Sequence, residues 1–237
     1  IDAATGINAI NQGADLVMIS GTLNTFPYSF VTQKEIRKPE DLTGKKIGIL
    51  AVGGATETAT FLLLKAWNIA RQSVTIFPAG DSAARIVALS AKAIDGTMLS
   101  YPDINEALRL GMHELVKMPD VKGTSFPMNV MVARRSFVEK NRDTVKRFQQ
   151  AYAEGTYQFM TSREKGLAVL SKRLRFKNPK GLEETYDYFA RSFAMPTRVS
   201  QEGLRNTLEI IAQRNPAVKV DMNIGKYLDE SIVAYQE

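Results

Sequence analysis

Cysteine is absent from this 237-residue sequence, and histidine occurs once. Without a thiol, the chain has no disulfide framework, thiolate zinc site, iron–sulfur cluster or cysteine nucleophile. The single histidine, His113, has no second histidine or cysteine with which to share a metal ion. Its neighbours Gly111 and Glu114 place it in an exposed loop after a helix. We therefore predict no metal site, no catalytic residue and no cofactor.

Long apolar runs are also missing. Stretches such as residues 61–64 fall far short of the roughly 18 residues of a membrane span. The chain opens Ile1-Asp2-Ala3-Ala4, without Met or a basic, apolar leader, so we expect a processed or trimmed N-terminus. Glycine and proline show ordinary usage and no period, while 44% of the residues are apolar, which excludes collagen-like and disordered classes.

Charge of one sign is nowhere concentrated. The 31 Lys and Arg outnumber the 25 Asp and Glu, giving a net charge of +6, but they are interspersed along the chain. This distribution predicts a mixed-charge surface and no nucleic-acid partner. Neither GxGxxG nor GxxxxGK[ST] occurs, since Gly48 leads to Gly53 and Gly54 with no lysine to reach a phosphate. A nucleotide cofactor is disfavoured.

What the sequence contains is an alternation of short β-rich runs with helical spacing. Strands are predicted at 16–19, 45–50, 74–77, 96–99 and 129–133, with helices at 57–67 and 82–91, the latter capped by Ser82. This order is typical of an α/β fold with parallel strands and helical crossovers. From about residue 136 the pattern is helical, beginning with a capping box from Ser136 to Glu139 and ending with a run over 224–236.

One unit of the chain occurs twice. Residues 9–20 are echoed by residues 88–100, with one residue inserted. Each copy has the end of a helix, a turn containing an aspartate, and a strand ending in a small polar residue. The repeat predicts two α/β lobes of similar design, unless the similarity of short apolar segments is fortuitous.

Several motifs together resemble a known family. They are PEDLTGKKIGI at 39–49, Gly53-Gly54-Ala55-Thr56 before a helix, the run from Ala88 to Pro102, and residues 137–148. In order and spacing these motifs are similar to the solute-binding proteins of ABC transporters, in the branch with nitrate, sulfonate, taurine and thiamine-pyrimidine binding proteins. The similarity covers nearly all of the chain.

The resemblance implies a periplasmic-binding-protein type II fold, in which two α/β lobes joined by two crossing strands hold a ligand cleft. Lobe one would contain residues 1–31, lobe two residues 32–130, and the mainly helical residues 131–237 would return to lobe one. The crossings would be 30–32 and 131–133. Such proteins begin with a strand, a helix and a second strand that are absent here, so the chain is either a fragment or builds its first lobe differently.

Ligands of open α/β sheets bind beyond the carboxyl ends of the strands. Gly53, Gly54, Ala55 and Thr56 lie at such a position, where small residues, free amides and a hydroxyl at a helix start favour an anion. The alternative is an ordinary turn in which glycine only supplies an unusual dihedral angle.

The remaining predicted site residues follow other strands. By the repeat, Gly21 and Thr22 follow the strand that ends at Ser20, and Ser100 and Tyr101 follow its echo. Asp81 either contacts an amine or caps the helix near Ser82, which we favour. Phe126 and Asn129 either wall the site or pack a lobe.

The resemblance implies a non-enzymatic receptor, located in the periplasm, that captures a small anionic or heteroaromatic solute and passes it to an ABC permease. We expect a monomer that closes around its ligand. An enzyme on the same scaffold remains an alternative, although thiamine-pyrimidine synthases carry a cysteine-rich motif that is lacking here; menaquinone-pathway enzymes also use the fold. A sensor module is the third reading and would need an attached output domain.

Overall fold

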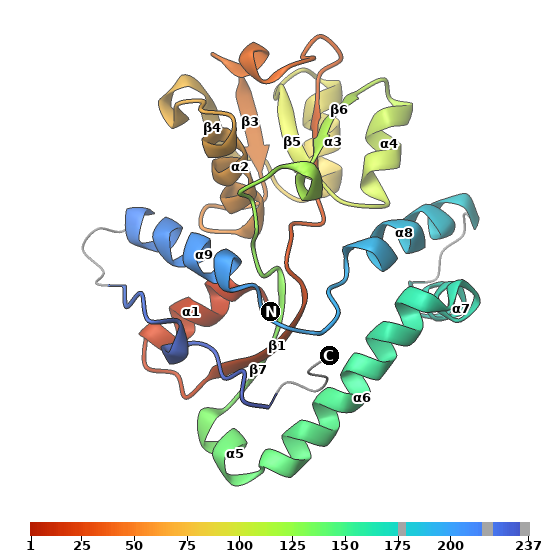
Figure 1. Ribbon diagram of the computed structural model, residues 1–237. Coiled ribbons are helices and arrows are strands. Elements are labelled where there is room, and N and C mark those ends of the chain that lie inside the picture. The colour runs from red at the N-terminus through yellow and green to blue at the C-terminus, as the bar shows by residue number, and fades with distance from the viewer. Residues whose placement is uncertain (175–178, 215–219, 233–237) are drawn as a thin grey trace. The chain divides into compact units, whose positions relative to one another are not determined.

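The computed structural model describes residues 1–174, 179–214 and 220–232, and its elements carry the labels of Figure 1. The chain divides into two compact units. Unit 1 contains Ile1–Thr25, Ser125–Lys177 and Tyr186–Glu237, and unit 2 contains Phe26–Thr124 and Asn178–Thr185. Residues 30–32 and 131–133, the predicted crossing strands, lie in β2 of unit 2 and β7 of unit 1.

Unit 2 contains a five-stranded sheet in the order β4-β3-β5-β2-β6. Its strands are β2 (Ser29–Thr32), β3 (Lys46–Ile49), β4 (Thr75–Pro78), β5 (Gly96–Leu99) and β6 (His113–Lys117). Strand β3 runs parallel to β4 and β5, whereas β2 runs antiparallel to β5 and β6. The prediction of parallel strands is therefore confirmed for three strands of this sheet only. The predicted loop at His113 is wrong, because this residue begins β6.

Helices α2 (Ala55–Ala66), α3 (Ser82–Ser90) and α4 (Asp103–Arg109) complete unit 2, with 3-10 turns at Pro39–Leu42, Arg71–Ser73 and Met118–Asp120. A core cluster joins α3 and α4 to the sheet through buried Val31, Ile86, Leu89, Ile94, Leu99, Ile104 and Ala107. Burying each of the larger aliphatic side chains contributes about 1.5–3 kcal/mol.

Unit 1 is built on two antiparallel strands, β1 (Val17–Leu23) and β7 (Asn129–Ala133), whose register shifts twice along β1. Its helices are α1 (Ala3–Asn11), α5 (Arg135–Lys140), α6 (Arg142–Thr161), α7 (Arg163–Leu174) and α9 (Gln201–Arg214). Helix α8 (Pro179–Ser192) contributes residues to both units. Val17, Ile19, Val138, Val145 and Ile232 form a core cluster of unit 1.

Two predictions about helix ends are wrong in this part. Helix α5 begins at Arg135 without a side-chain cap, because the Ser136 hydroxyl donates instead to the carboxylate of Asp15. In place of the predicted helical run over 224–236, residues 224–232 contain a 3-10 turn at Ile224–Lys226 and a bridge at Leu228, and residues 233–236 lie outside the described residues. A local capping pattern gives way when a partner distant in sequence supplies a stronger, charged acceptor.

The repeated turn has a common structural role in its two copies. The Asp15 carboxylate accepts from the backbone amide of Ser136 at 3.3 Å, and the Asp95 carboxylate accepts from the amide of Lys46 at 2.8 Å. Each aspartate thus ties the start of its strand to a neighbouring segment. The Ser136 hydroxyl bond lowers the pKa of Asp15 below its ordinary 3.8.

Of the helices described, none combines the length and the apolar character needed to cross a bilayer.

Candidate functional site

Five predicted site residues lie at one edge of the unit 2 sheet. Because β3, β4 and β5 are parallel, their carboxyl ends meet at the same edge. The loop after β3 carries Gly53 and Gly54, the loop after β4 carries Asp81, and the loop after β5 carries Ser100 and Tyr101. We call this group of loops the unit 2 edge.

The start of α2 is more internally bonded than the sequence suggests. The Gly53 amide donates to Glu57 Oε2 at 2.8 Å, and the Gly54 amide donates to the Ala51 carbonyl at 3.3 Å. The Thr56 hydroxyl accepts from the Leu50 amide at 2.9 Å. Ala55 is the first residue of the helix, and the φ of +82° at Gly53 favours glycine there.

Glu57 is a residue that sequence reasoning missed at this position. Its side chain is only 7% exposed and lies in the first turn of α2, where the helix dipole favours a negative charge. The Glu57 carboxylate therefore lies at the start of α2, the position that the sequence predicts for an anionic solute. An acidic residue in the first turn is a known capping signal, and it could have been recognised in the sequence.

Asp81 caps α3. Its carboxylate accepts from the Ala84 amide at 2.9 Å, while Ser82 is the first helical residue and not the cap. The prediction that Ser82 caps this helix is wrong, and our preferred reading of Asp81 as a cap is confirmed. The Asp81 carboxylate is nevertheless exposed at the unit 2 edge.

Tyr101 is half-buried and packs against the core cluster of unit 2. Burial raises the pKa of its hydroxyl above 10, and the carboxylates of Glu114 and Glu184 raise it further. The hydroxyl therefore stays protonated at neutral pH and can donate a hydrogen bond. Ser100 precedes it, and the Ser100 carbonyl accepts from the Ile104 amide at 3.2 Å at the start of α4.

Arg85 is a second residue of this edge that we did not predict. It belongs to α3, yet only 5% of its surface is exposed. Its Nε donates to the carbonyl of Gly80 at 3.1 Å, and Nη1 donates to the Thr97 hydroxyl at 2.8 Å and to the Met98 carbonyl. Burial lowers the pKa of this guanidinium, while Tyr28, Asp103 and Asp81 oppose the shift. Helical periodicity marks position 85 only as a core position, so the sequence alone does not indicate a charged group at this edge.

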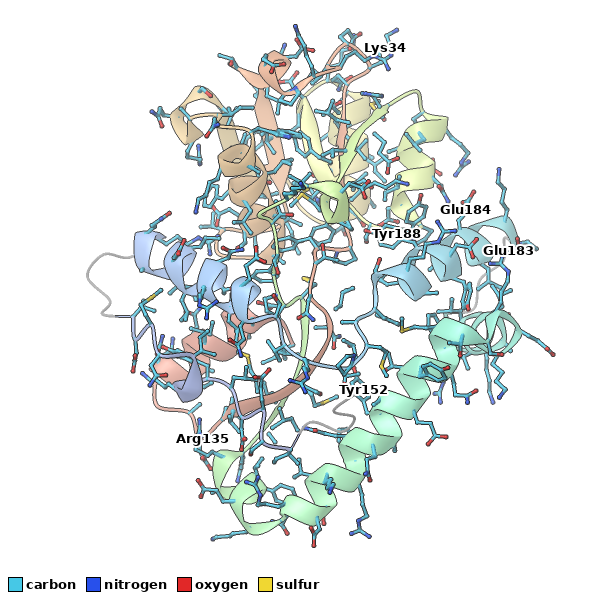
Figure 2. All side chains as sticks on the ribbon, viewed as in Figure 1. Lys34, Arg135, Tyr152, Glu183, Glu184 and Tyr188 are labelled. Atoms are coloured by element: carbon cyan, nitrogen blue, oxygen red, sulfur yellow. The ribbon has the colours of Figure 1, made fainter. Side chains whose placement is uncertain are left out.

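In unit 1, Thr22 connects three elements. Its hydroxyl donates to the Asn129 side-chain oxygen at 3.3 Å and lies 3.0 Å from the hydroxyl of Tyr152 on α6. Figure 2 labels Tyr152 on that helix. Two of the predicted residues, Thr22 and Asn129, are thus brought together, because β1 and β7 pair at this point.

A pocket of about 390 Å³ adjoins this network within unit 1. Polar groups are few, and rings from α6 and α8 form much of the wall. The lining residues are Thr22, Ala151, Tyr152, Gly155, Thr156, Phe159, Leu170, Phe189 and Phe193. We call this the Thr22 pocket. Aromatic walls with a small number of polar groups are typical of sites for small organic ligands.

Gly21 and Phe126 have packing roles in this structure. A Cβ atom at Gly21 would lie 3.2 Å from the Cα of Val199, so the strand and that segment approach closely. Phe126 is fully buried, and its amide donates to the Asn24 carbonyl at 3.1 Å. Contact of these two residues with a solute stays a prediction.

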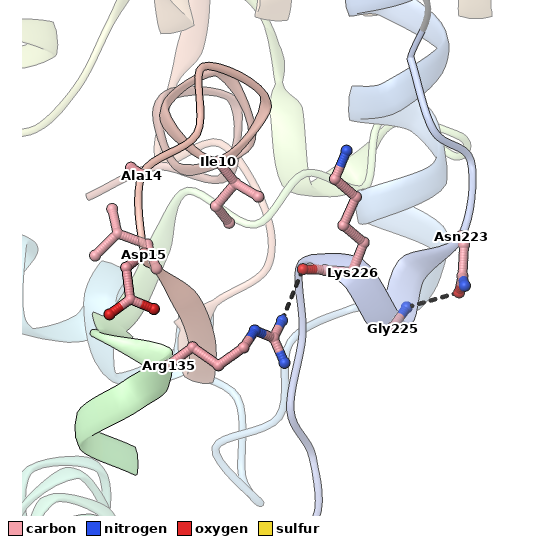
Figure 3. A pocket seen from close by; sticks show the side chains of 8 residues that line it. Ile10, Ala14, Asp15, Arg135, Asn223, Gly225 and Lys226 are labelled. Atoms are coloured by element: carbon pink, nitrogen blue, oxygen red, sulfur yellow. Dashed lines mark hydrogen bonds between the residues drawn. The ribbon is translucent and has the colours of Figure 1, made fainter. Parts of the chain in front are cut away.

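A second pocket of unit 1, of about 520 Å³, lies at the start of β1 (Figure 3). Arg135 and Lys226 both line it, and Arg135 Nη2 donates to the Lys226 carbonyl at 2.8 Å. The Gly225 amide donates to the Asn223 side chain. Tyr227 anchors the same segment by donating to Asn11 at 2.9 Å. Residues 223–227 thus attach to α1 and α5 at this point, and the pocket is a junction of chain segments.

Within residues 1–174, 179–214 and 220–232, no group of three or more His, Asp or Glu side chains is arranged to hold a metal ion.

The sequence model of the family described as NMT1/THI5 like matches residues 3–165, more than half of the chain. The taurine-binding periplasmic protein of Escherichia coli (strain K12) is 32% identical over 124 residues, which are 52% of this chain and 38% of that protein. The match thus spans well under half of this curated relative.

Solved structures show the fold. The periplasmic aliphatic sulphonate binding protein SsuA of Escherichia coli matches with a TM-score of 0.76 and 18% identity, over 100% of this chain and 77% of that one. The alkanesulfonate-binding protein SsuA of Xanthomonas axonopodis pv. citri, bound to MOPS, matches with a TM-score of 0.68 and 14% identity, over 92% and 75%. The predicted α/β fold of the periplasmic-binding-protein class is confirmed.

Proposed function

Since the chain belongs to the NMT1/THI5-like family, we propose that it is part of a solute-binding receptor that captures a small molecule for an ABC importer. The proposal includes an extracytoplasmic location, a membrane permease as partner, and binding without chemical turnover. The names of the taurine-binding and sulphonate-binding relatives support it.

The unit 2 edge is the observation that carries this proposal. Three parallel strands end together there, and their loops carry the exposed Gly53 and the half-buried Gly54, Ser100 and Tyr101. Small residues let a solute approach the main chain closely, and a half-buried tyrosine offers both an aromatic face and a hydroxyl. This arrangement binds and orients a molecule without needing a nucleophile.

An enzyme is the second candidate, but the sequence favours a receptor. A thiamine-pyrimidine synthase would carry a cysteine-rich motif, and the chain contains no cysteine. The proposed solute is a small organic anion, in line with the named relatives, or a heteroaromatic compound, which would suit the rings of the Thr22 pocket.

Isothermal titration with taurine, ethanesulfonate, MOPS, nitrate and a pyrimidine tests the proposal. We expect saturable binding of at least one compound. The NMR spectrum of that compound should be unchanged after prolonged incubation with the protein. Conversion of a bound compound into a product would favour the enzyme. Absence of binding across the panel would contradict the receptor function.

A further inference from the structure

Arg85 combines burial with charge in a way that calls for an explanation. Only 5% of the residue's surface is exposed, and within the described part of the chain no carboxylate lies within 4.0 Å of its guanidinium. A buried cation without an ion-pair partner is costly, because protein surroundings replace the water that stabilised it. Side chains of this kind are retained where another group supplies the compensating charge.

The hydrogen bonds of the Arg85 guanidinium show which of its N–H donors have acceptors within the protein. Arginine has five N–H donors in a planar fork. Nε donates to the carbonyls of Gly80 and Asp81, and both Nη1 hydrogens have acceptors in Thr97 and Met98. Nη2 makes no hydrogen bond to the described residues. One face of the fork is thus fixed to β5 and the start of α3, and the other has two donors to offer.

The partners of Arg85 show where in unit 2 its guanidinium lies. Its bonds reach the carbonyls of the loop after β4 and the last residues of β5, both of which end at the unit 2 edge. The groups that act electrostatically on its charge, Tyr28, Asp103 and Asp81, all lie next to strand ends of the same sheet. These bonds and charges place the Arg85 guanidinium at the unit 2 edge.

From this geometry we propose that Arg85 is the charge-selecting residue of the unit 2 edge, and that Nη2 donates to an oxygen of an organic sulfonate or carboxylate solute. The inference rests on the proposed receptor function and names the residue and solute class for it. Glu57 already occupies the start of α2, so the negative charge of the solute is recognised by Arg85 in place of the amides around Gly53. The neighbouring carboxylates of Asp81 and Asp103 would disfavour a second negative charge, so a monoanion is expected.

The experiment compares matched solutes and matched variants of the 237-residue chain. Titration calorimetry of the unchanged protein with ethanesulfonate and its neutral isostere ethanesulfonamide measures charge selection directly. Arg85→Lys keeps the positive charge but removes the fork. Arg109→Lys is the same substitution on an exposed arginine of α4 in unit 2, which pairs with Glu106 on its own helix, and serves as the control.

We expect ethanesulfonate to bind at least tenfold more tightly than the sulfonamide, and Arg85→Lys to weaken ethanesulfonate by about tenfold or more, as the loss of charge-assisted hydrogen bonds implies. Arg109→Lys should bind like the unchanged protein. Thermal unfolding of each variant without solute separates weaker binding from loss of the fold. If Arg85→Lys does not fold, the affinities of the unchanged protein for ethanesulfonate and ethanesulfonamide still show whether the site selects a negatively charged solute.

The outcomes distinguish the two proposals. Equal affinity for ethanesulfonate and ethanesulfonamide, or a folded Arg85→Lys variant with unchanged affinity and selectivity, overturns the role of Arg85 and leaves the receptor function standing. Failure of the unchanged protein to bind any sulfonate or carboxylate, while it binds a neutral compound, also overturns the role of Arg85. Failure to bind any compound at all overturns the receptor function itself.

Discussion

At the scale of single residues, Asp81 shows how one carboxylate can be read in two ways. It lies among the loops of the unit 2 edge, yet its oxygen accepts from the Ala84 amide at 2.9 Å and completes the first turn of α3. Asparagine caps a helix about as well as aspartate does, whereas alanine does not. The two substitutions therefore separate the capping role from any role of the charge.

We predict that Asp81→Asn leaves stability close to that of the unchanged protein and does not weaken the binding of an anionic solute. Asp81→Ala should lower the free energy of unfolding by about 1 kcal/mol, because the amide of Ala84 loses its acceptor. Urea denaturation and calorimetric titration measure the two quantities. A folded Asp81→Asn variant that no longer binds would make the carboxylate a solute contact and not only a cap.

His113 is the residue whose charge responds to pH near neutrality. Burial lowers its pKa below 6.5, the exposed Arg37 guanidinium beside Nδ1 lowers it further, and Glu114 opposes both. Between the lowered pKa and pH 6.5 the unfolded chain binds more protons than the folded protein. Stability contributed by neutral His113 is therefore complete above pH 6.5 and is lost as the pH falls through that window.

We predict that Arg37→Gln raises the pKa of His113, because it removes a positive charge that disfavours the imidazolium. The ring proton chemical shifts in an NMR titration measure this directly, since the chain has no other histidine. His113→Gln should flatten the dependence of stability on pH between about 5 and 7. An unchanged pKa in Arg37→Gln would show that burial alone causes the shift.

At the scale of elements, the packing of α7 against α8 depends on a glycine. A Cβ atom at Gly166 would lie 2.2 Å from Cε2 of Tyr186, closer than any real contact. The Tyr186 ring has little freedom to move, because its hydroxyl donates to the Phe159 carbonyl at 3.0 Å and its ring packs on Phe159. Gly155 on α6 has no atom within 4 Å of the equivalent point.

We predict opposite effects for the same substitution at these two glycines. Gly155→Ala should stabilise the protein by up to about 1 kcal/mol, through the higher helix propensity of alanine. Gly166→Ala gains the same propensity but must displace Tyr186, and we expect a net loss of about 1–3 kcal/mol, the range for overpacking. Equilibrium denaturation of both variants provides the comparison. A stabilised Gly166→Ala would mean that α7 shifts freely on α8.

At the scale of the whole molecule, the predicted site residues are divided between the two units. Gly21, Thr22, Phe126 and Asn129 belong to unit 1, and the remainder, with Arg85, belong to unit 2. Each unit has a core cluster of its own. Units with separate cores can unfold in separate steps, and a solute stabilises only what it contacts.

We therefore predict two transitions in differential scanning calorimetry. A solute at about 100 times its dissociation constant adds roughly 2.7 kcal/mol to the stability of the part that binds it. A shift of both transitions would support the predicted capture by residues of both units. A shift confined to one would restrict the site to that unit. If that unit is unit 2, the tenfold weaker binding expected of Arg85→Lys should reduce the stabilisation from about 2.7 to about 1.4 kcal/mol at the same solute concentration.

The sequence by itself determined the fold class, most strand and helix positions, the family resemblance and the absence of thiol chemistry, because periodicity, spacing and composition are local properties of the chain. It placed β5 and β7 at their observed bounds, and it identified Asp81 as a helix cap from its neighbours. These features depend on residues that are close together in the sequence.

Only the tertiary structure decided which groups meet. Ser136 donates to Asp15 in place of closing its own capping box, and residues 113–117 form strand β6 because β2 pairs with them. Arg85 shows the same limit for the site. Its spacing in α3 indicates a buried position, whereas the acceptors that fix one side of its guanidinium come from residues 97 and 98. Hydrogen bonds and charges act through space, so partners far apart in the chain become visible only once it is folded.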